Sequence, residues 1–179
     1  MVIPGTSAPA LKVQTVRHGM FDLAANKPEH FSLVVFYRGL HCPICLKYLR
    51  ELGALLPEFA KRGVQVVVLS TDDAERAAEM DRKIGVADLR HGFGLTPANA
   101  REWGLYLSQG IGKTSIGVEE PALFAEPGVF LVRADHTLYY ASVQTMPFAR
   151  PSFADLLASV DFVLAKNYPA RGGYTGELG

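Results

Sequence analysis

The residues best suited to chemistry in this sequence are two cysteines, Cys42 and Cys45, the only cysteines in the chain. A Cys-x-x-Cys pair is typical of either half of a zinc site or a redox-active dithiol. A structural zinc site needs four ligands, and the five histidines show no His-x-x-x-His spacing that would supply the missing two. A disulfide between residues only three apart closes a loop too short to stabilise the fold. The spacing therefore predicts redox chemistry and no bound metal.

The position of the pair predicts which cysteine reacts first. Cys42 follows an apolar segment and precedes Pro43, a residue favoured at the first position of a helix. Free N–H groups and the positive end of the helix dipole stabilise a thiolate there. Arg38 and His41, just upstream, are candidates for adding positive potential. We expect Cys42 to be the nucleophile and Cys45 to resolve the intermediate as a disulfide. The alternative is that both are small buried side chains.

The segments around the pair have the pattern of alternating strands and helices. Residues 31–37 are nearly all apolar, as in a central strand covered on both faces. A helix is predicted over 43–60, with a kink or an early end at Pro57. A second buried strand is predicted over 64–69, and the capping-box pattern of Ser70 to Asp73 opens a helix that stops at Gly85.

The remaining segments complete a mixed sheet. Strands are predicted at 11–16, 129–133 and 137–143, a short helix at 96–103 and a closing helix at 151–166, which Arg150 and Pro151 begin. This order predicts an α/β fold with a mixed β-sheet flanked by helices on both faces. Residues 1–179 are expected to form one domain.

Composition excludes several classes of protein. Eighteen basic residues balance eighteen acidic ones, so the chain lacks the excess of positive charge typical of nucleic-acid binding. No apolar run approaches the roughly 20 residues of a membrane span. The first residues lack the basic and apolar regions of a signal peptide. We therefore expect a cytoplasmic protein with no nucleic-acid or membrane partner.

Beyond these patterns, the chain resembles the AhpC/TSA (redoxin) family of the thioredoxin superfamily over about residues 5–165. The resemblance is carried by Gly5-Thr-Ser-Ala-Pro9, Leu33-Val-Val-Phe-Tyr-Arg-Gly-Leu-His-Cys42-Pro43, Val67-Val-Leu-Ser70, Trp103-Gly-Leu105 and Val129-Phe-Leu-Val-Arg-Ala-Asp-His-Thr-Leu138. It implies a thioredoxin-like fold and reduction of a peroxide, or of a disulfide, by cysteine thiolate. It also implies a thiol electron donor such as a thioredoxin or glutathione, no cofactor, and a homodimer as one assembly.

The chain also departs from the family pattern. Val35 and Gly39 stand where the family's peroxidases have a Pro and a Thr or Ser, and Pro127 stands where they have a peroxide-binding Arg. In thioredoxins the position of Pro127 is a cis-proline against the disulfide. We expect Gly39, Pro43 and Pro127 to line the substrate site, with Arg38 and His41 as catalytic neighbours and His41 as a proton handler.

Three other functions remain open at this point. One is a thioredoxin-like protein thiol–disulfide oxidoreductase, which would act on disulfides in place of peroxides. The others are a metal-handling protein of the copper-chaperone type and a redox sensor.

Overall fold

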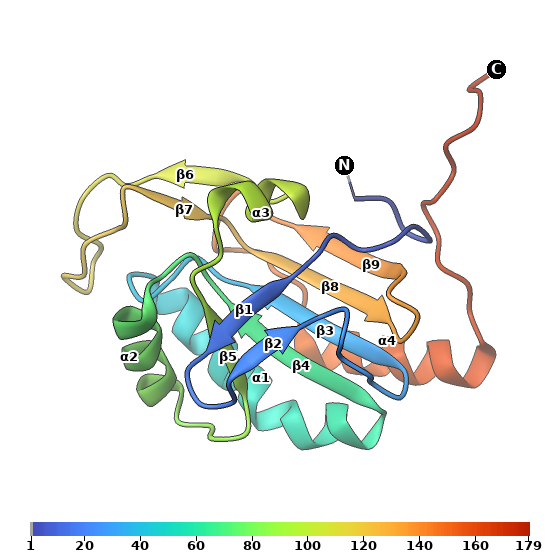
Figure 1. Ribbon diagram of the computed structural model, residues 1–179, viewed down its shortest axis with the longest axis horizontal. Coiled ribbons are helices and arrows are strands. Elements are labelled where there is room, and N and C mark those ends of the chain that lie inside the picture. Colours follow the sequence, from blue (N-terminus) through green and yellow to red (C-terminus); the bar gives the residue numbers. More distant parts are fainter. Residues whose placement is uncertain (1) are drawn as a thin grey trace.

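Seven strands form one mixed sheet in the order β2-β1-β5-β4-β3-β8-β9 in the computed structural model, which describes residues 2–179 (Figure 1). The strands of this sheet are β1 (Lys12–Thr15), β2 (Met20–Asp22), β3 (Phe31–Phe36), β4 (Val64–Leu69), β5 (Arg90–Phe93), β8 (Gly128–Arg133) and β9 (Leu138–Val143). A separate antiparallel pair consists of β6 (Leu107–Gln109) and β7 (Leu123–Ala125). The helices are α1 (Pro43–Lys61), α2 (Ala74–Ile84), α3 (Pro97–Glu102) and α4 (Phe153–Lys166).

Strand β3 lies at the centre of the sheet. It pairs in parallel with β4 and antiparallel with β8, and all six of its residues are buried. Leu33 and Val35 belong to the same core cluster as both cysteines and the inner faces of α1, α2 and α4. Val34 and Phe36 face the opposite side, where they pack with Trp103. Burial on both faces explains why this segment has no polar alternation.

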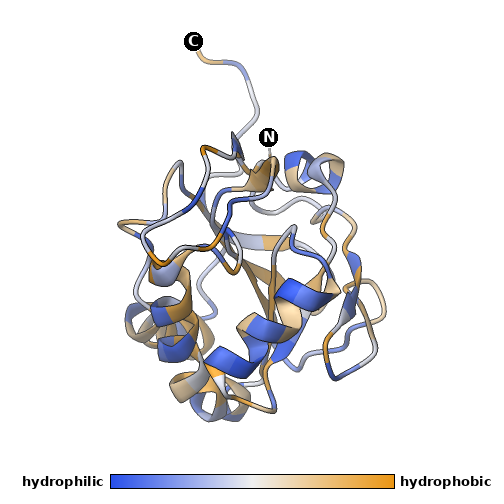
Figure 2. Ribbon diagram, turned by 90° about the vertical axis from the view of Figure 1, so that its left-hand side faces the viewer, coloured by the Kyte–Doolittle hydropathy of each residue, from blue (hydrophilic) through white to orange (hydrophobic). Residues whose placement is uncertain are grey.

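The two faces of the sheet are covered unequally. The three longer helices α1, α2 and α4 lie together on one face (Figure 1). The short helix α3 and the N-terminal segment cover the other. Figure 2 shows the apolar strands inside and hydrophilic turns of helix outside. The predicted mixed sheet with helices on both faces is therefore confirmed, with most of the helical mass on the cysteine side.

Two details of the predicted helices are corrected. Helix α1 does not end early at Pro57, because Phe59 is fully buried and anchors the last turn against the core. Helix α2 begins at Ala74, and its cap is Asp73, whose carboxylate accepts the N–H of Arg76. Ser70 instead accepts the N–H of Asp72 in the preceding turn.

Several strands escape the sequence patterns. β2 and β6 contain three residues each, and β5 reads Arg-His-Gly-Phe, which has no apolar alternation. Such short or polar strands form because neighbouring strands offer them hydrogen-bond partners.

Within residues 2–179, none of the helices combines the length and the apolar character that crossing a membrane requires.

Candidate active site

Cys42 occupies the N-cap position of α1, directly after the turn that follows β3. Its backbone is extended, and its Sγ accepts the backbone N–H of Cys45 at 3.2 Å. Pro43 at the first helical position lacks an N–H that would otherwise need a partner. The pKa of Cys42 is lowered to about 7, first by the side-chain hydrogen bond from Cys45 and then by the Cys45 N–H, Arg150 and Arg38, although burial opposes this shift. Cys42 is therefore partly thiolate near neutral pH.

Cys45 lies one turn further along the same helix and is fully buried. Burial, together with its hydrogen bond to Cys42, raises the pKa of the Cys45 thiol well above its usual range. Both cysteines are in the free thiol state. The arrangement places a thiolate and a protonated thiol side by side, which is the charge state needed for one sulfur to attack and the other to resolve.

Arg150 is a basic residue in contact with the Cys45 sulfur. It comes from the connection between β9 and α4, and its Nη1 donates to the Sγ of Cys45 at 3.6 Å. Its guanidinium carbon lies 4.1 Å from the ring centroid of Tyr48, whose hydroxyl donates to the carbonyl of Pro151 at 2.6 Å. The Nη2 of Arg150 is buried and has no hydrogen-bond partner among residues 2–179. The contacts with Tyr48 and Cys45 fix the position of this guanidinium, and its Nη2 can still donate a hydrogen bond.

The sequence did not indicate this role for Arg150. Its pattern marked only the start of the last helix, whose cap is Ser152. Arg150 and Cys45 are 105 residues apart, so no local spacing could have connected them. Met146 and Phe148, in the same connection, are about half exposed.

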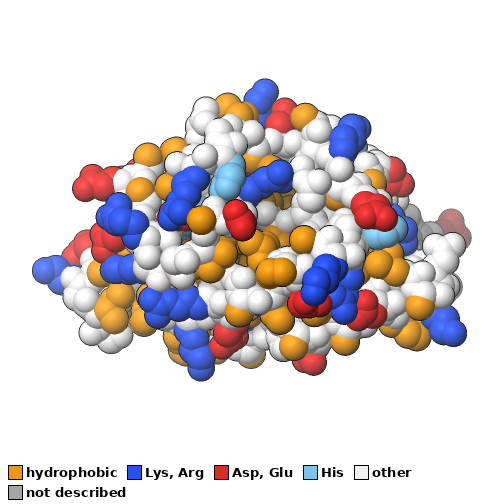
Figure 3. All heavy atoms as spheres, turned by 90° about the horizontal axis from the view of Figure 1, so that it is seen from below, with side chains coloured by type: hydrophobic (Ala, Val, Ile, Leu, Met, Phe, Trp, Pro, Cys, Tyr) orange, Lys and Arg blue, Asp and Glu red, His pale blue; other side chains and the backbone are white. Residues whose placement is uncertain are grey.

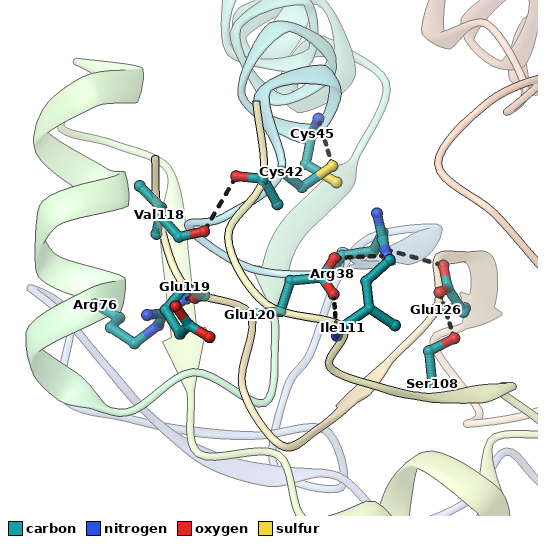
Figure 4. Close-up of polar contacts among 11 residues, drawn as sticks. Arg38, Cys42, Cys45, Arg76, Ser108, Ile111, Val118, Glu119, Glu120 and Glu126 are labelled. Carbon is teal, nitrogen blue, oxygen red and sulfur yellow. Dashed lines mark hydrogen bonds and ion pairs between the residues drawn. The ribbon is translucent and has the colours of Figure 1, made fainter. Parts of the chain in front are cut away.

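Arg38, which the sequence marked as a catalytic candidate, is bound by two carboxylates. Its Nη2 lies 3.3 Å from Glu120 Oε1, and its Nε lies 3.2 Å from Glu126 Oε2 (Figure 4). Ser108 donates a further hydrogen bond to Glu126 at 2.6 Å. The guanidinium carbon also lies 4.7 Å from the ring centroid of Phe124. The side chains of Arg38, Glu120 and Glu126 are only 17%, 6% and 4% exposed, so this charge is compensated inside the protein.

His41 precedes Cys42 and is fully buried against the ring of Phe124, with ring centroids 4.7 Å apart. Burial, together with the nearby charge of Arg38, lowers the pKa of His41 to about 4. The ring is therefore neutral near pH 7 and adds no positive charge to the site. Within the part of the chain that the structure describes, neither ring nitrogen has a hydrogen-bond partner.

Gly39 has a backbone reason for being glycine. Its φ is +144°, and a Cβ there would lie 2.8 Å from a carboxylate oxygen of Asp72. Asp72 is buried, accepts the N–H of Leu40 at 2.7 Å and pairs with Arg76 at 2.9 Å. Burial raises the pKa of Asp72. Asp72 thus fixes the turn that presents Cys42.

The two prolines assigned to the substrate site lie in different settings. Pro43 is exposed in the first turn of α1, directly beside Cys42. Pro127 is buried just before β8, its peptide bond is trans, and its carbonyl accepts the N–H of Gln144.

A segment between β6 and β7, residues 110–121, crosses in front of the dithiol and is called the strap below (Figure 4). Glu120 joins it to Arg38, and Arg76 donates to the carbonyl of Glu119 at 3.1 Å. Val118 packs against the core cluster that contains both cysteines. Glu120 also accepts the N–H of Ile111 at 2.9 Å, which closes the strap on itself. The strap therefore forms one wall of the site and is anchored by two arginines.

Comparison with known proteins identifies the family and the fold. The model of the AhpC/TSA family matches residues 4–141. The fold is similar to that of peroxidoxin BcpB from Mycobacterium tuberculosis, with a TM-score of 0.70, 17% identity and coverage of 91% of this chain and 99% of that one.

It is also similar to the reduced 2-Cys peroxiredoxin of Plasmodium vivax, with a TM-score of 0.73, 15% identity and coverage of 93% and 84%. A third similar structure is reduced Prx3 of Vibrio vulnificus in complex with H2O2, with a TM-score of 0.69, 12% identity and coverage of 89% and 99%. At these identities the structures establish the fold. No curated protein matches the chain.

Proposed function

The chain belongs to the AhpC/TSA family, and we propose that it is a peroxiredoxin-like oxidoreductase whose Cys42–Cys45 dithiol reduces peroxides with electrons from a cellular thiol. The observation that carries this proposal is the pairing of a stabilised Cys42 thiolate at the start of α1 with a protonated, buried Cys45. One of the similar structures was solved with hydrogen peroxide, which supports the substrate class.

In the first step the Cys42 thiolate attacks the terminal oxygen of the peroxide. An S–O bond forms, the O–O bond breaks, and the leaving oxygen takes a proton to depart as water or an alcohol. Cys42 becomes a sulfenic acid. In the second step the Cys45 sulfur attacks Cys42 Sγ, so that the S–S bond forms and water leaves. Two thiols of the donor then regenerate the dithiol.

Arg150 is proposed to bind the peroxide in place of the arginine that the family pattern puts at Pro127. Proline has no N–H to donate, whereas Arg150 has a buried Nη2 without a partner beside the dithiol. A preorganised donor of this kind stabilises the charge that develops on the leaving oxygen. Arg38 is less suited to this role because Glu120 and Glu126 already occupy it.

Pro43 and the Gly39 turn are proposed to shape the entrance and to present the sulfur. His41 is proposed as a neutral hydrogen-bonding neighbour, since its ring nitrogens are unpartnered. We also propose a cytoplasmic location, where cellular thiols keep a dithiol reduced, and a homodimer as the assembly.

The direct experiment is rapid mixing of the fully reduced protein with hydrogen peroxide, followed by mass spectrometry of Cys42 and Cys45. We expect fast conversion to the internal disulfide, abolished in Cys42→Ser. In Cys45→Ser, oxidation should stop at a Cys42 sulfenic acid. Oxidation no faster than that of a free thiol, with rapid exchange against protein disulfides, would move the assignment to a thioredoxin-like reductase.

A further inference from the structure

A groove of about 380 Å³ lies between the first half of α1 and the connection that follows β9. It is lined by Ile44, Lys47, Tyr48, Glu51, Pro147, Phe148, Ala149, Arg150 and Ser152. Its size suits a small molecule or a few residues of peptide.

The groove borders the dithiol through two of its lining residues, Ile44 and Arg150. Ile44, in its wall, stands between the two cysteines in the helix. Arg150, also in its wall, contacts Cys45 Sγ through Nη1 and leaves the buried Nη2 unpartnered. A buried guanidinium nitrogen without a partner is costly unless a ligand or water accepts from it. A ligand that accepts from Nη2 would therefore lie next to the disulfide once it has formed.

The charges in the groove favour an anionic ligand. Lys47 and Arg150 are cationic, and Glu51 is the only acidic side chain in the wall. Ile44 and Phe148 add exposed apolar surface. The chain as a whole has no net charge, and basic and acidic side chains both occur across the face shown in Figure 3. A preference for anions would therefore come from this groove and not from the overall field of the protein.

The burial of the sulfurs disfavours a protein as the donor. Cys42 is 2% exposed and Cys45 is 0% exposed. The strap is fixed to the body through Arg38 and Arg76. A folded partner must bring a whole surface close to these buried sulfurs beside the fixed strap, whereas a small thiol brings only a few atoms.

We propose that this groove is the binding site for the electron donor, and that the donor is a low-molecular-weight thiol carrying carboxylates. The proposal rests on the proposed function, because it assigns the thiol that re-reduces the dithiol. One carboxylate pairs with Arg150 and another with Lys47, while an ammonium of an amino-acid-like thiol pairs with Glu51.

Reduction of the disulfide by this donor takes two thiol–disulfide exchanges. A donor thiolate forms a bond to one sulfur of the Cys42–Cys45 disulfide, and the other cysteine leaves as a thiolate. A second donor thiolate attacks the donor sulfur of this mixed disulfide and releases the donor as its own disulfide. Two donor thiols lose two electrons and two protons, and the dithiol gains both.

The test measures only the reduction of a disulfide formed beforehand with diamide, so it does not depend on peroxide. The reductants are glutathione, neutral 2-mercaptoethanol, cationic cysteamine and a thioredoxin, and rates for the small thiols are compared at equal thiolate concentration. The variant is Lys47→Glu, which reverses one charge of the groove. The matched control is Lys27→Glu, an exposed lysine before β3, at the opposite end of that strand from Cys42.

Glutathione should reduce the wild-type disulfide about fivefold or more faster than cysteamine, as expected for partly screened charge pairs. Lys47→Glu should remove most of this preference, and Lys27→Glu should keep it. Equal rates for anionic and cationic thiols, the same effect in both variants, or faster reduction by thioredoxin than by an equal concentration of glutathione would each overturn the proposal. If the donor assignment fails while peroxide still oxidises Cys42 rapidly, the proposed function stands without it.

Discussion

Two arginines lie near the dithiol, and their surroundings differ. Arg38, on the strap side, is paired with Glu120 and Glu126 and lies against Phe124. Arg150, on the side of the β9–α4 connection, lies against Tyr48, donates to Cys45 Sγ and has no carboxylate partner. Both are close enough to lower the pKa of Cys42, and the effect of Arg150 is the larger.

The comparison shows that proximity in the sequence is a poor guide to which cation acts on a sulfur. Arg38 is four residues from Cys42, but its charge is compensated by two buried carboxylates. Arg150 is distant in the sequence and keeps free donor capacity at the sulfurs. We therefore assign a structural role in holding the strap to the first and a chemical role to the second.

The largest expected effect is the loss of stability in Arg38→Met. This substitution leaves Glu120 and Glu126 buried without their cation, which costs about 3 kcal/mol in comparable buried pairs. Urea unfolding measures the change. A triple variant that adds Glu120→Gln and Glu126→Gln should recover much of the stability. A loss below about 1 kcal/mol, typical of exposed pairs, would contradict a structural role for Arg38.

Arg150→Gln should mainly slow the chemistry. Removing a preorganised donor at the reacting oxygen should lower the second-order rate of Cys42 oxidation by about tenfold or more. The measurement is stopped-flow oxidation at a pH well above 7, where Cys42 is fully thiolate in both proteins. An equal or greater loss of oxidation rate in the folded fraction of Arg38→Met would contradict the chemical role assigned to Arg150.

The rate of Cys42 oxidation should depend on pH differently in the Arg150 and Arg38 variants. Because the thiolate is the nucleophile, the oxidation rate of the wild type should rise with pH and level off above the Cys42 pKa of about 7. Below that pKa the rate should fall about tenfold per pH unit. Arg150→Gln should move the midpoint to higher pH, since a cation that favours the thiolate is lost. Arg38→Met should move it less, and a larger shift in Arg38→Met would reverse the assignment of the two arginines.

The smallest effect is expected in the strap. Glu120→Gln weakens the ion pair to Arg38 and the hold on Ile111 while the contact of Arg76 with Glu119 remains. Alkylation of Cys42 by a bulky maleimide should become about two- to threefold faster, a change typical of one partly screened charge pair. The exposed substitution Glu75→Gln in α2 serves as the control. An unchanged alkylation rate would mean that the strap does not limit access.

Much of the fold, and the positions of the two cysteines in the site, could be predicted because the signals are local. The run of apolar residues in β3, Pro43 at the start of α1 and the two-residue spacing of the cysteines all act within one or two turns of chain. The hairpin of β8 and β9 and the closing helix α4 also follow from short-range patterns. The positions of Cys42 and Cys45 at a helix start are therefore a property of the sequence.

Other features depend on partners far along the chain. Strand β1 and the edge strand β2 meet the rest of the sheet through β5, whose own sequence has no strand pattern. Glu120 reaches Arg38 across 82 residues, and Arg150 reaches Cys45 across 105. His41 carries no charge near neutral pH because the fold buries it completely, which its place in a turn did not indicate.

The sequence alone thus determined a dithiol at the end of a buried strand and the start of a helix, because backbone capping, proline placement and apolar periodicity act between near neighbours. Only the tertiary structure decided which charges reach the sulfurs. Charge effects depend on distance, burial and compensation by other groups, and these are set by packing between segments that the sequence places far apart.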